Sequence, residues 1–176
     1  MRMSPLPADE WDDDVRRALS VIVPEDRLNP EAAGTALSTL VRHPSLTKAF
    51  LRFSTHLLFR NSLDTRTREL AILRTAHRKQ CSYEWAHHVF IAKAEGITDD
   101  EIAGIQHGTL DDPADQIVLD AVDELDEHAR ISDDTWAALS DRYDERQRMD
   151  LVFTIGGYGL LAAAYNTFGI EPESGH

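Results

Sequence analysis

The residues best suited to chemistry lie close together, between positions 69 and 97. This stretch holds the only cysteine, Cys81, two glutamates, Glu69 and Glu84, and three of the eight histidines, among them His88. Cys81, Glu84 and His88 are three and four residues apart, so a helix would present all three on one face. There a carboxylate could orient an imidazole, and the imidazole could shuttle a proton or lower the pKa of the thiol.

A second carboxylate belongs to the neighbouring segment. Glu69 lies before Cys81, on the preceding predicted helix. An antiparallel pair of helices could bring its carboxyl to His88 or to Cys81, and the sequence leaves that contact open.

Each of these residues also has a plain structural interpretation. A single cysteine is more often a small buried apolar residue than a nucleophile, and a Glu–His pair four residues apart is often a solvated surface pair. Zinc is a further option, since Cys81, Glu84, His88 and His77 are all ligand types. Neither a CxxC nor an HExxH pair accompanies them. We therefore expect neither a metal nor a cofactor.

The elements that carry these residues are predicted to be helices. Apolar residues recur at intervals of three and four, and alternating patterns are nearly absent, which indicates an all-α fold. Asp64 is a good cap for a helix over 65–78, which carries Glu69. A helix over 82–95 carries Glu84 and His88, with Cys81 at or just before its first turn. Further helices are expected over about 8–21, 30–42, 44–59, 98–106, 113–129, 132–139 and 145–166.

The last predicted helix contains the segment LVFTIGGYGLLAAAY, which is apolar nearly all round. We expect this helix to be central or to lie at a subunit contact. Gly156, Gly157 and Gly159 weaken it intrinsically, and we interpret them as allowing close helix–helix approach, because GGYG matches no nucleotide fingerprint. A faint likeness between residues 65–73 and 144–153 hints at an internal duplication.

Composition limits the class of protein. With 176 residues, 42% of them hydrophobic and 28% charged, we expect one globular domain over 1–176, with loose ends at 1–8 and 171–176. The net charge of −13 disfavours nucleic-acid binding. No run approaches the roughly eighteen apolar residues of a membrane span, and the N-terminus lacks an apolar signal core. We expect a cytoplasmic protein with a small-molecule substrate and no membrane partner.

The arrangement Glu69-x11-Cys81-x2-Glu84-x3-His88 resembles the signature of the carboxymuconolactone decarboxylase / AhpD-like family. In the alkylhydroperoxidase branch that signature is E-x11-C-x2-C-x3-H. The flanks RTRELAILRTA, YEWAHH and IAKAEGITDDEI are similar to the family as well. The likeness is strong over about 45–106 and softer over 115–170. It is closest to the branch with Tyr-Glu-Trp-x-x-His in place of the second cysteine.

The resemblance implies an AhpD-like fold of about seven to nine helices that forms trimers or hexamers, with sites near subunit contacts. In the peroxidase branch two cysteines cycle between dithiol and disulfide, while a glutamate and a histidine relay protons. Glu69, Cys81 and His88 match that pattern. Position 84 departs from it, because Glu84 stands where the second thiol belongs. A CxxC dithiol cycle within one chain is therefore excluded.

The function we expect is that of a carboxymuconolactone decarboxylase-like lyase doing cofactor-independent acid–base chemistry on a small carboxylated or carbonyl substrate. His88 would shuttle the proton, Glu84 or Glu69 would orient it or act as the base, and Cys81 would be a polar wall or a hydrogen-bond partner. Arg68 or Arg74 could receive a substrate carboxylate. Two alternatives stay open. One is a hydroperoxide reductase with peroxiredoxin-type antioxidant activity that uses Cys81 alone, and the other is a non-catalytic helical oligomer.

Overall fold

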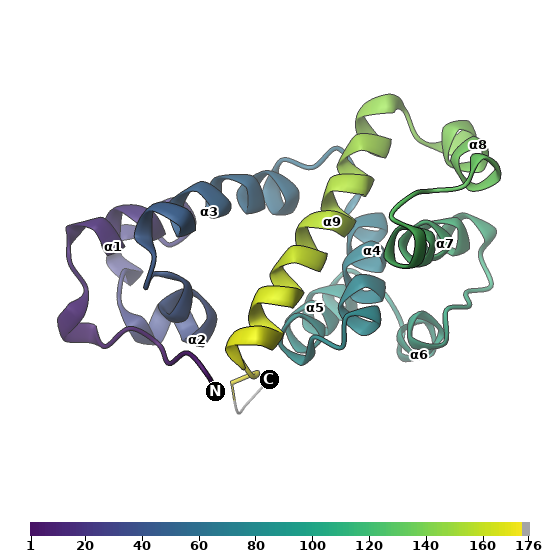
Figure 1. Cartoon of the computed structure of the whole chain (residues 1–176). Helices are drawn as coiled ribbons and strands as arrows, with labels where there is room; N and C mark the ends of the chain where they lie inside the picture. Colours follow the sequence, from purple (N-terminus) through teal and green to yellow (C-terminus); the bar gives the residue numbers. More distant parts are fainter. Residues whose placement is uncertain (174–176) are drawn as a thin grey trace. The chain divides into compact units, whose positions relative to one another are not determined.

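The computed structural model describes residues 1–173. Within this part of the chain all regular secondary structure is helical, with nine α-helices and two short 3₁₀ helices (Figure 1). The predicted all-α class is confirmed. The chain divides into two compact units, which we call unit 1 and unit 2. Unit 1 comprises Met1–Arg60 and the described residues after Asn166, and unit 2 comprises Asn61–Asn166.

Unit 1 is built on three helices, of which α1 packs against α3. Its core includes the side chains of Val15, Leu19 and Leu51. The helix expected over 8–21 is in fact a 3₁₀ turn followed by α1, because Asp12 accepts a hydrogen bond from the amide of Val15 and so caps a new helix. The elements are the 3₁₀ helices Ala8–Glu10 and Glu25–Arg27, α1 (Asp13–Leu19), α2 (Pro30–Leu40) and α3 (Pro44–Phe59).

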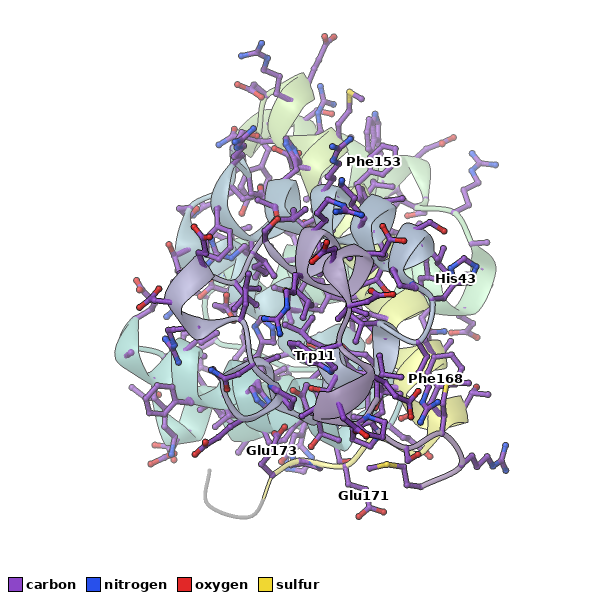
Figure 2. All side chains as sticks on the ribbon, turned by 90° about the vertical axis from the view of Figure 1, so that its left-hand side faces the viewer. Trp11, His43, Phe153, Phe168, Glu171 and Glu173 are labelled. Carbon is purple, nitrogen blue, oxygen red and sulfur yellow. The ribbon has the colours of Figure 1, made fainter. Side chains whose placement is uncertain are left out.

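The two ends of the described chain meet within unit 1. The amides of Arg2 and Met3 both donate to the carbonyl of Phe168, at 2.8 and 3.1 Å. Glu173, labelled in Figure 2 on the chain that follows α9, accepts a hydrogen bond of 2.8 Å from the amide of Thr35. Arg2, Met3 and Glu173 belong to the ends that were expected to be loose, and these hydrogen bonds hold them in place. Positions 174–176 of the tail lie outside the described residues.

Unit 2 is organised around α4, which packs against α5, α6 and α7 (Figure 1). Every residue from Glu69 to Ala76 is buried. Eight consecutive residues cover every side of a helix, so neighbours surround this part of α4. The helices of this unit are α4 (Thr65–Arg78), α5 (Ser82–Ala94), α6 (Asp99–His107), α7 (Pro113–His128), α8 (Asp133–Arg142) and most of α9 (Glu145–Phe168).

Arg74 ties α4 to two neighbouring helices. Its guanidinium donates to both carboxylate oxygens of Asp123 on α7, at 2.8 and 2.6 Å, and to the carbonyls of Ile105 and Gln106 near the end of α6, at 2.7 and 2.9 Å. Arg74 is buried. These contacts argue against the candidate role of Arg74 in receiving a substrate carboxylate.

The apolar helix α9 is long enough and apolar enough to cross a membrane by length and composition alone. The expectation that no segment meets this criterion is therefore corrected. Seven of its residues are nevertheless buried, including Leu151 and Ile155 of the unit 2 core. A core helix passes the same test. Phe153 and Leu160 on α9 are exposed, so the expectation of a central helix or of one at a subunit contact stays a prediction.

Candidate functional site

His88 lies between two buried carboxylates. Its Nδ1 is 2.6 Å from Oε2 of Glu69, and its Nε2 is 3.4 Å from Oε2 of Glu84. Glu69 is fully buried, and His88 and Glu84 are each only 5% exposed. The packing of α4 against α5 thus makes the contact between Glu69 and His88 that the sequence left open. We refer to Glu69, Glu84 and His88, with Arg68, as the His88 cluster.

The helix α5 turns its ionisable residues inward. Its three buried residues are Glu84, His88 and Ala92, whereas Phe90 on the same helix is 73% exposed. Burying a carboxylate and an imidazole is unfavourable unless hydrogen bonds or opposite charges compensate. The inward placement is therefore a departure from ordinary amphipathic patterning, and such departures concentrate at functional sites.

Arg68 completes the charge balance of the cluster. Its Nε and Nη2 are each 3.1 Å from Oε1 of Glu69, so each carboxylate oxygen of Glu69 contacts a different cationic side chain. The Arg68 side chain is 15% exposed, against 0% for Glu69. With Arg68 and His88 both protonated, two positive charges face the two carboxylates of the cluster.

The protonation state of His88 follows from its two partners. Burial lowers the pKa of His88, but the hydrogen bonds to Glu69 and Glu84 and their negative charges outweigh burial and raise the pKa to about 9. The imidazole is therefore protonated at neutral pH, and each ring N–H points to a carboxylate. In this state His88 is a proton donor.

Two tyrosines of α9 form an aromatic wall beside the cluster. The ring of Tyr158 meets that of His88 edge to face, with centroids 5.0 Å apart and planes at 86°. Tyr165, two turns later, makes a similar contact with Tyr83 at 5.0 Å. Burial and the negative charge of Glu84 raise the pKa of both α9 phenols well above the usual value, so both hydroxyls stay protonated. Sequence reasoning missed these residues. Their seven-residue spacing on one helix face was the available signal.

Cys81 occupies the position before α5 and is buried. Burial raises the pKa of its thiol, the charge of Glu84 raises it further, and the amides of Glu84 and Tyr83 only partly oppose this. The thiol is therefore protonated at neutral pH. A reactive cysteine requires the opposite environment, one that stabilises the thiolate.

The four potential zinc ligands considered above do not converge. His77 lies against the ring of Trp85, with centroids 5.8 Å apart in an edge-to-face contact. Over residues 1–173, no group of three or more His, Cys, Asp and Glu side chains has the arrangement needed to hold a metal ion.

Residues 44–127 match the model of the carboxymuconolactone decarboxylase family. No curated protein sequence matches the chain.

Several solved structures share the fold. A peroxidase-related protein from Ralstonia eutropha JMP134, described as an alkylhydroperoxidase AhpD core, is 19% identical with a TM-score of 0.77, over 99% of this chain and 94% of that one. The debrominase Bmp8 is 16% identical with a TM-score of 0.76, over 98% and 92%. A putative antioxidant defence protein AhpD of unknown function from Agrobacterium tumefaciens is 17% identical with a TM-score of 0.67, over 75% and 93%. At these identities the likeness establishes an AhpD-like fold.

Proposed function

Because this chain belongs to the carboxymuconolactone decarboxylase / AhpD-like family through residues 44–127, we propose that it is an enzyme of cofactor-independent acid–base chemistry. Its substrate would be a small carboxylated or carbonyl compound, and the reaction a decarboxylation or a related proton transfer. The observation that carries this proposal is His88, held as an imidazolium between two buried carboxylates.

The two nitrogens of His88 have different tasks in this mechanism. The short contact to Glu69, 2.6 Å from Nδ1, fixes the ring and holds one proton in place. The contact from Nε2 to Glu84 is longer, at 3.4 Å. The Nε2 proton is therefore the one that can be transferred, and Glu84 is the carboxylate beside it before the transfer.

Loss of carbon dioxide from a carboxylated carbonyl compound breaks one C–C bond and leaves its electron pair on the remaining fragment as an enolate. The positive charge of His88 would stabilise that enolate. Its Nε2 proton would then form the new C–H bond. Neutral His88, between two carboxylates and with a pKa of about 9 when folded, would regain a proton from solvent.

The alternatives are less well supported. Hydroperoxide reduction by Cys81 needs a thiolate, and burial raises the pKa of this thiol. A non-catalytic helical scaffold is favoured by one observation, the low exposure of the His88 cluster, in which His88 and Glu84 are each 5% exposed.

The decisive experiment compares two variants against a panel of small β-keto acids and carboxylated lactones. We expect Cys81→Ser to keep turnover, and His88→Ala to reduce it by roughly a hundredfold or more, as loss of a general acid does. Loss of turnover in Cys81→Ser together with normal turnover in His88→Ala would contradict the acid–base proposal. Trapping of a Cys81 sulfenic acid by dimedone after peroxide treatment would favour the hydroperoxide reductase. Absence of turnover on the whole panel, with no trapped adduct, would favour the scaffold.

A further inference from the structure

The two sides of α9 differ in how closely the chain packs against them. Apart from the neighbouring backbone of α9, a Cβ added to Gly156 would meet no described atom within 4 Å, and one added to Gly159 would meet only Cε of Lys79, at 3.8 Å. The interpretation that these two glycines permit close helix approach is therefore wrong within the described structure. Tyr158, by contrast, is one of the buried residues of α9, and its ring packs against the His88 cluster.

The hydroxyl of Tyr158 has no partner in the described part of the chain. Tyr158 is only 5% exposed, yet its hydroxyl makes no hydrogen bond with any of residues 1–173. The hydroxyl is not sealed from solvent either, since the polar atoms that are both sealed and without a hydrogen bond belong to other residues. A buried tyrosine hydroxyl usually finds an acceptor. The acceptor for this one must therefore come from outside the chain, as water or as a bound molecule.

Tyr143, also in unit 2, shows the usual arrangement. It is buried to a similar degree, with 6% exposed, but its hydroxyl lies 3.3 Å from Oγ1 of Thr67, within hydrogen-bonding distance. The two tyrosines thus differ in one respect that matters for binding. The hydroxyl of Tyr143 has an internal partner, and that of Tyr158 is available to a ligand.

The surroundings of Tyr158 keep its hydroxyl in the donor state. Its ring meets that of His88 edge to face, with 5.0 Å between the centroids. Burial and the negative charges of Glu84 and Glu69 raise the pKa of the phenol, and Arg68 opposes them only in part. The hydroxyl therefore keeps its proton at neutral pH and can donate a hydrogen bond. It belongs to a ring that contacts the imidazole whose Nε2 proton is the transferable one.

We propose that Tyr158 is a catalytic residue of the acid–base site, and that its hydroxyl donates a hydrogen bond to a carbonyl oxygen of the substrate. This inference rests on the proposed function. When the C–C bond to the carboxylate breaks, carbon dioxide leaves and the electron pair moves onto that carbonyl, whose oxygen becomes an enolate. The hydrogen bond from Tyr158 strengthens as this charge develops, and no proton leaves the phenol. His88 then delivers its Nε2 proton to carbon, and the carbonyl is restored.

This role of Tyr158 narrows the substrate class. The electron pair can reach an oxygen only if the carbonyl lies on the carbon next to the one that bears the carboxylate. A β-keto acid meets this requirement, whereas a saturated carboxylic acid has no second oxygen to hold the pair. We therefore expect turnover of small β-keto acids and none of saturated acids with the same carbon chain.

The first test replaces Tyr158 by Phe, which keeps the ring and removes only the hydroxyl. With the β-keto acid that the wild type turns over fastest, kcat should fall about a hundredfold while KM changes little, because the lost contact forms chiefly in the transition state. Tyr143→Phe is the matched control. It should lower the urea concentration at the midpoint of unfolding and keep turnover, whereas Tyr158→Phe should keep the midpoint. A Tyr158→Phe variant with the kcat of the wild type would overturn the inference and leave the role of His88 intact.

A binding measurement separates this inference from the proposed function. The probe is 4-nitrophenolate, a stable coloured oxyanion that resembles an enolate because its charge lies on an oxygen of a planar conjugated frame. At about pH 8, where His88 is still protonated, it should bind Tyr158→Phe about tenfold more weakly than the wild type, and Tyr143→Phe as tightly as the wild type. Equal affinities of the wild type and Tyr158→Phe would overturn the inference. If this loss of affinity appeared but no β-keto acid were turned over, the proposed reaction would be wrong and the donor role of Tyr158 would stand.

Discussion

At the scale of single residues, the site depends on the unequal contacts of one imidazole. Glu69 is 2.6 Å from Nδ1 of His88, and Glu84 is 3.4 Å from Nε2. Both carboxylates favour the charged ring, but the shorter contact, from the fully buried Glu69, should do so more strongly. Glu69 thus sets the protonation state of His88, while Glu84 is the partner from which the proton can more easily leave.

The first prediction concerns the pKa of His88, measured by histidine-selective NMR. We expect about 9 in the wild type. Glu69→Gln should lower this pKa more than Glu84→Gln does, because the contact of Glu69 is shorter. The exposed Glu95→Gln, on the residue that follows α5, should leave it unchanged. A wild-type pKa near the ordinary value of 6.5 would contradict the assigned geometry.

The second prediction is the dependence of stability on pH. The folded pKa of His88, about 9, lies above the ordinary value of 6.5. The protonated His88 therefore contributes fully to the free energy of unfolding below about pH 6.5, and this contribution is lost as the pH rises through 9. Urea unfolding of the wild type and of His88→Gln should differ in slope over this window, by up to about 3 kcal/mol. If the free energy of unfolding of the two proteins changed in parallel from pH 6 to 10, the contribution of His88 protonation to stability would be ruled out.

At the scale of elements, unit 2 depends on contacts that hold short helices to α4. The end of α6 is one such place, since Arg74 donates to the carbonyls of Ile105 and Gln106 just before Gly108. Gly108 adopts a left-handed conformation, with φ of 80°, and ends α6. Gly96 does the same after α5, with φ of 87°. The two glycines share a backbone requirement but differ in their surroundings.

These two glycines give the third prediction. A Cβ on Gly108 would lie 2.6 Å from Nη2 of Arg74, whereas one on Gly96 would meet nothing within 4 Å. Gly96→Ala should cost about 1 kcal/mol of unfolding free energy, from the left-handed backbone alone. Gly108→Ala should cost clearly more, because it also displaces a buried arginine. If urea unfolding showed the same loss of unfolding free energy for both variants, Arg74 would be able to move away from the added Cβ at little cost.

At the scale of the whole molecule, the chain forms two units, and its described ends are joined within unit 1. The helix α2 is interrupted at Gly34, with φ of 72°, and the carboxylate of Glu173 accepts from the next amide, that of Thr35. A side chain near the C-terminus thus caps a helix segment more than a hundred residues earlier.

The fourth prediction follows from that cap. Glu173→Ala should speed amide hydrogen exchange at Thr35 and lower the stability of unit 1 by about 1 kcal/mol, as loss of a helix cap does. Glu171→Ala removes an exposed carboxylate from the same segment and serves as the control. Unchanged protection of the Thr35 amide in Glu173→Ala would mean that the contact does not form in solution.

Features that depend on local interactions could be predicted from the amino-acid sequence. Helix starts at Pro30, Pro44 and Thr65 follow from proline at the first turn and from the caps Asn29 and Asp64, which act over three residues. The common face of Glu84 and His88 follows from helical geometry alone. The exclusion of a dithiol cycle required only the presence of a single cysteine.

Contacts between distant segments could not be predicted in this way. The packing of the helices brings Glu69 to His88, places Tyr158 against the same ring, and buries the middle of α4 on all sides, which it does not do for the more apolar α9. Burial in the folded chain also raises the pKa of the Cys81 thiol, which supports the choice of the imidazole over sulfur already made from the sequence. The physical reason is that burial and charge depend on which helices surround a side chain, and a pattern along one helix does not specify its neighbours.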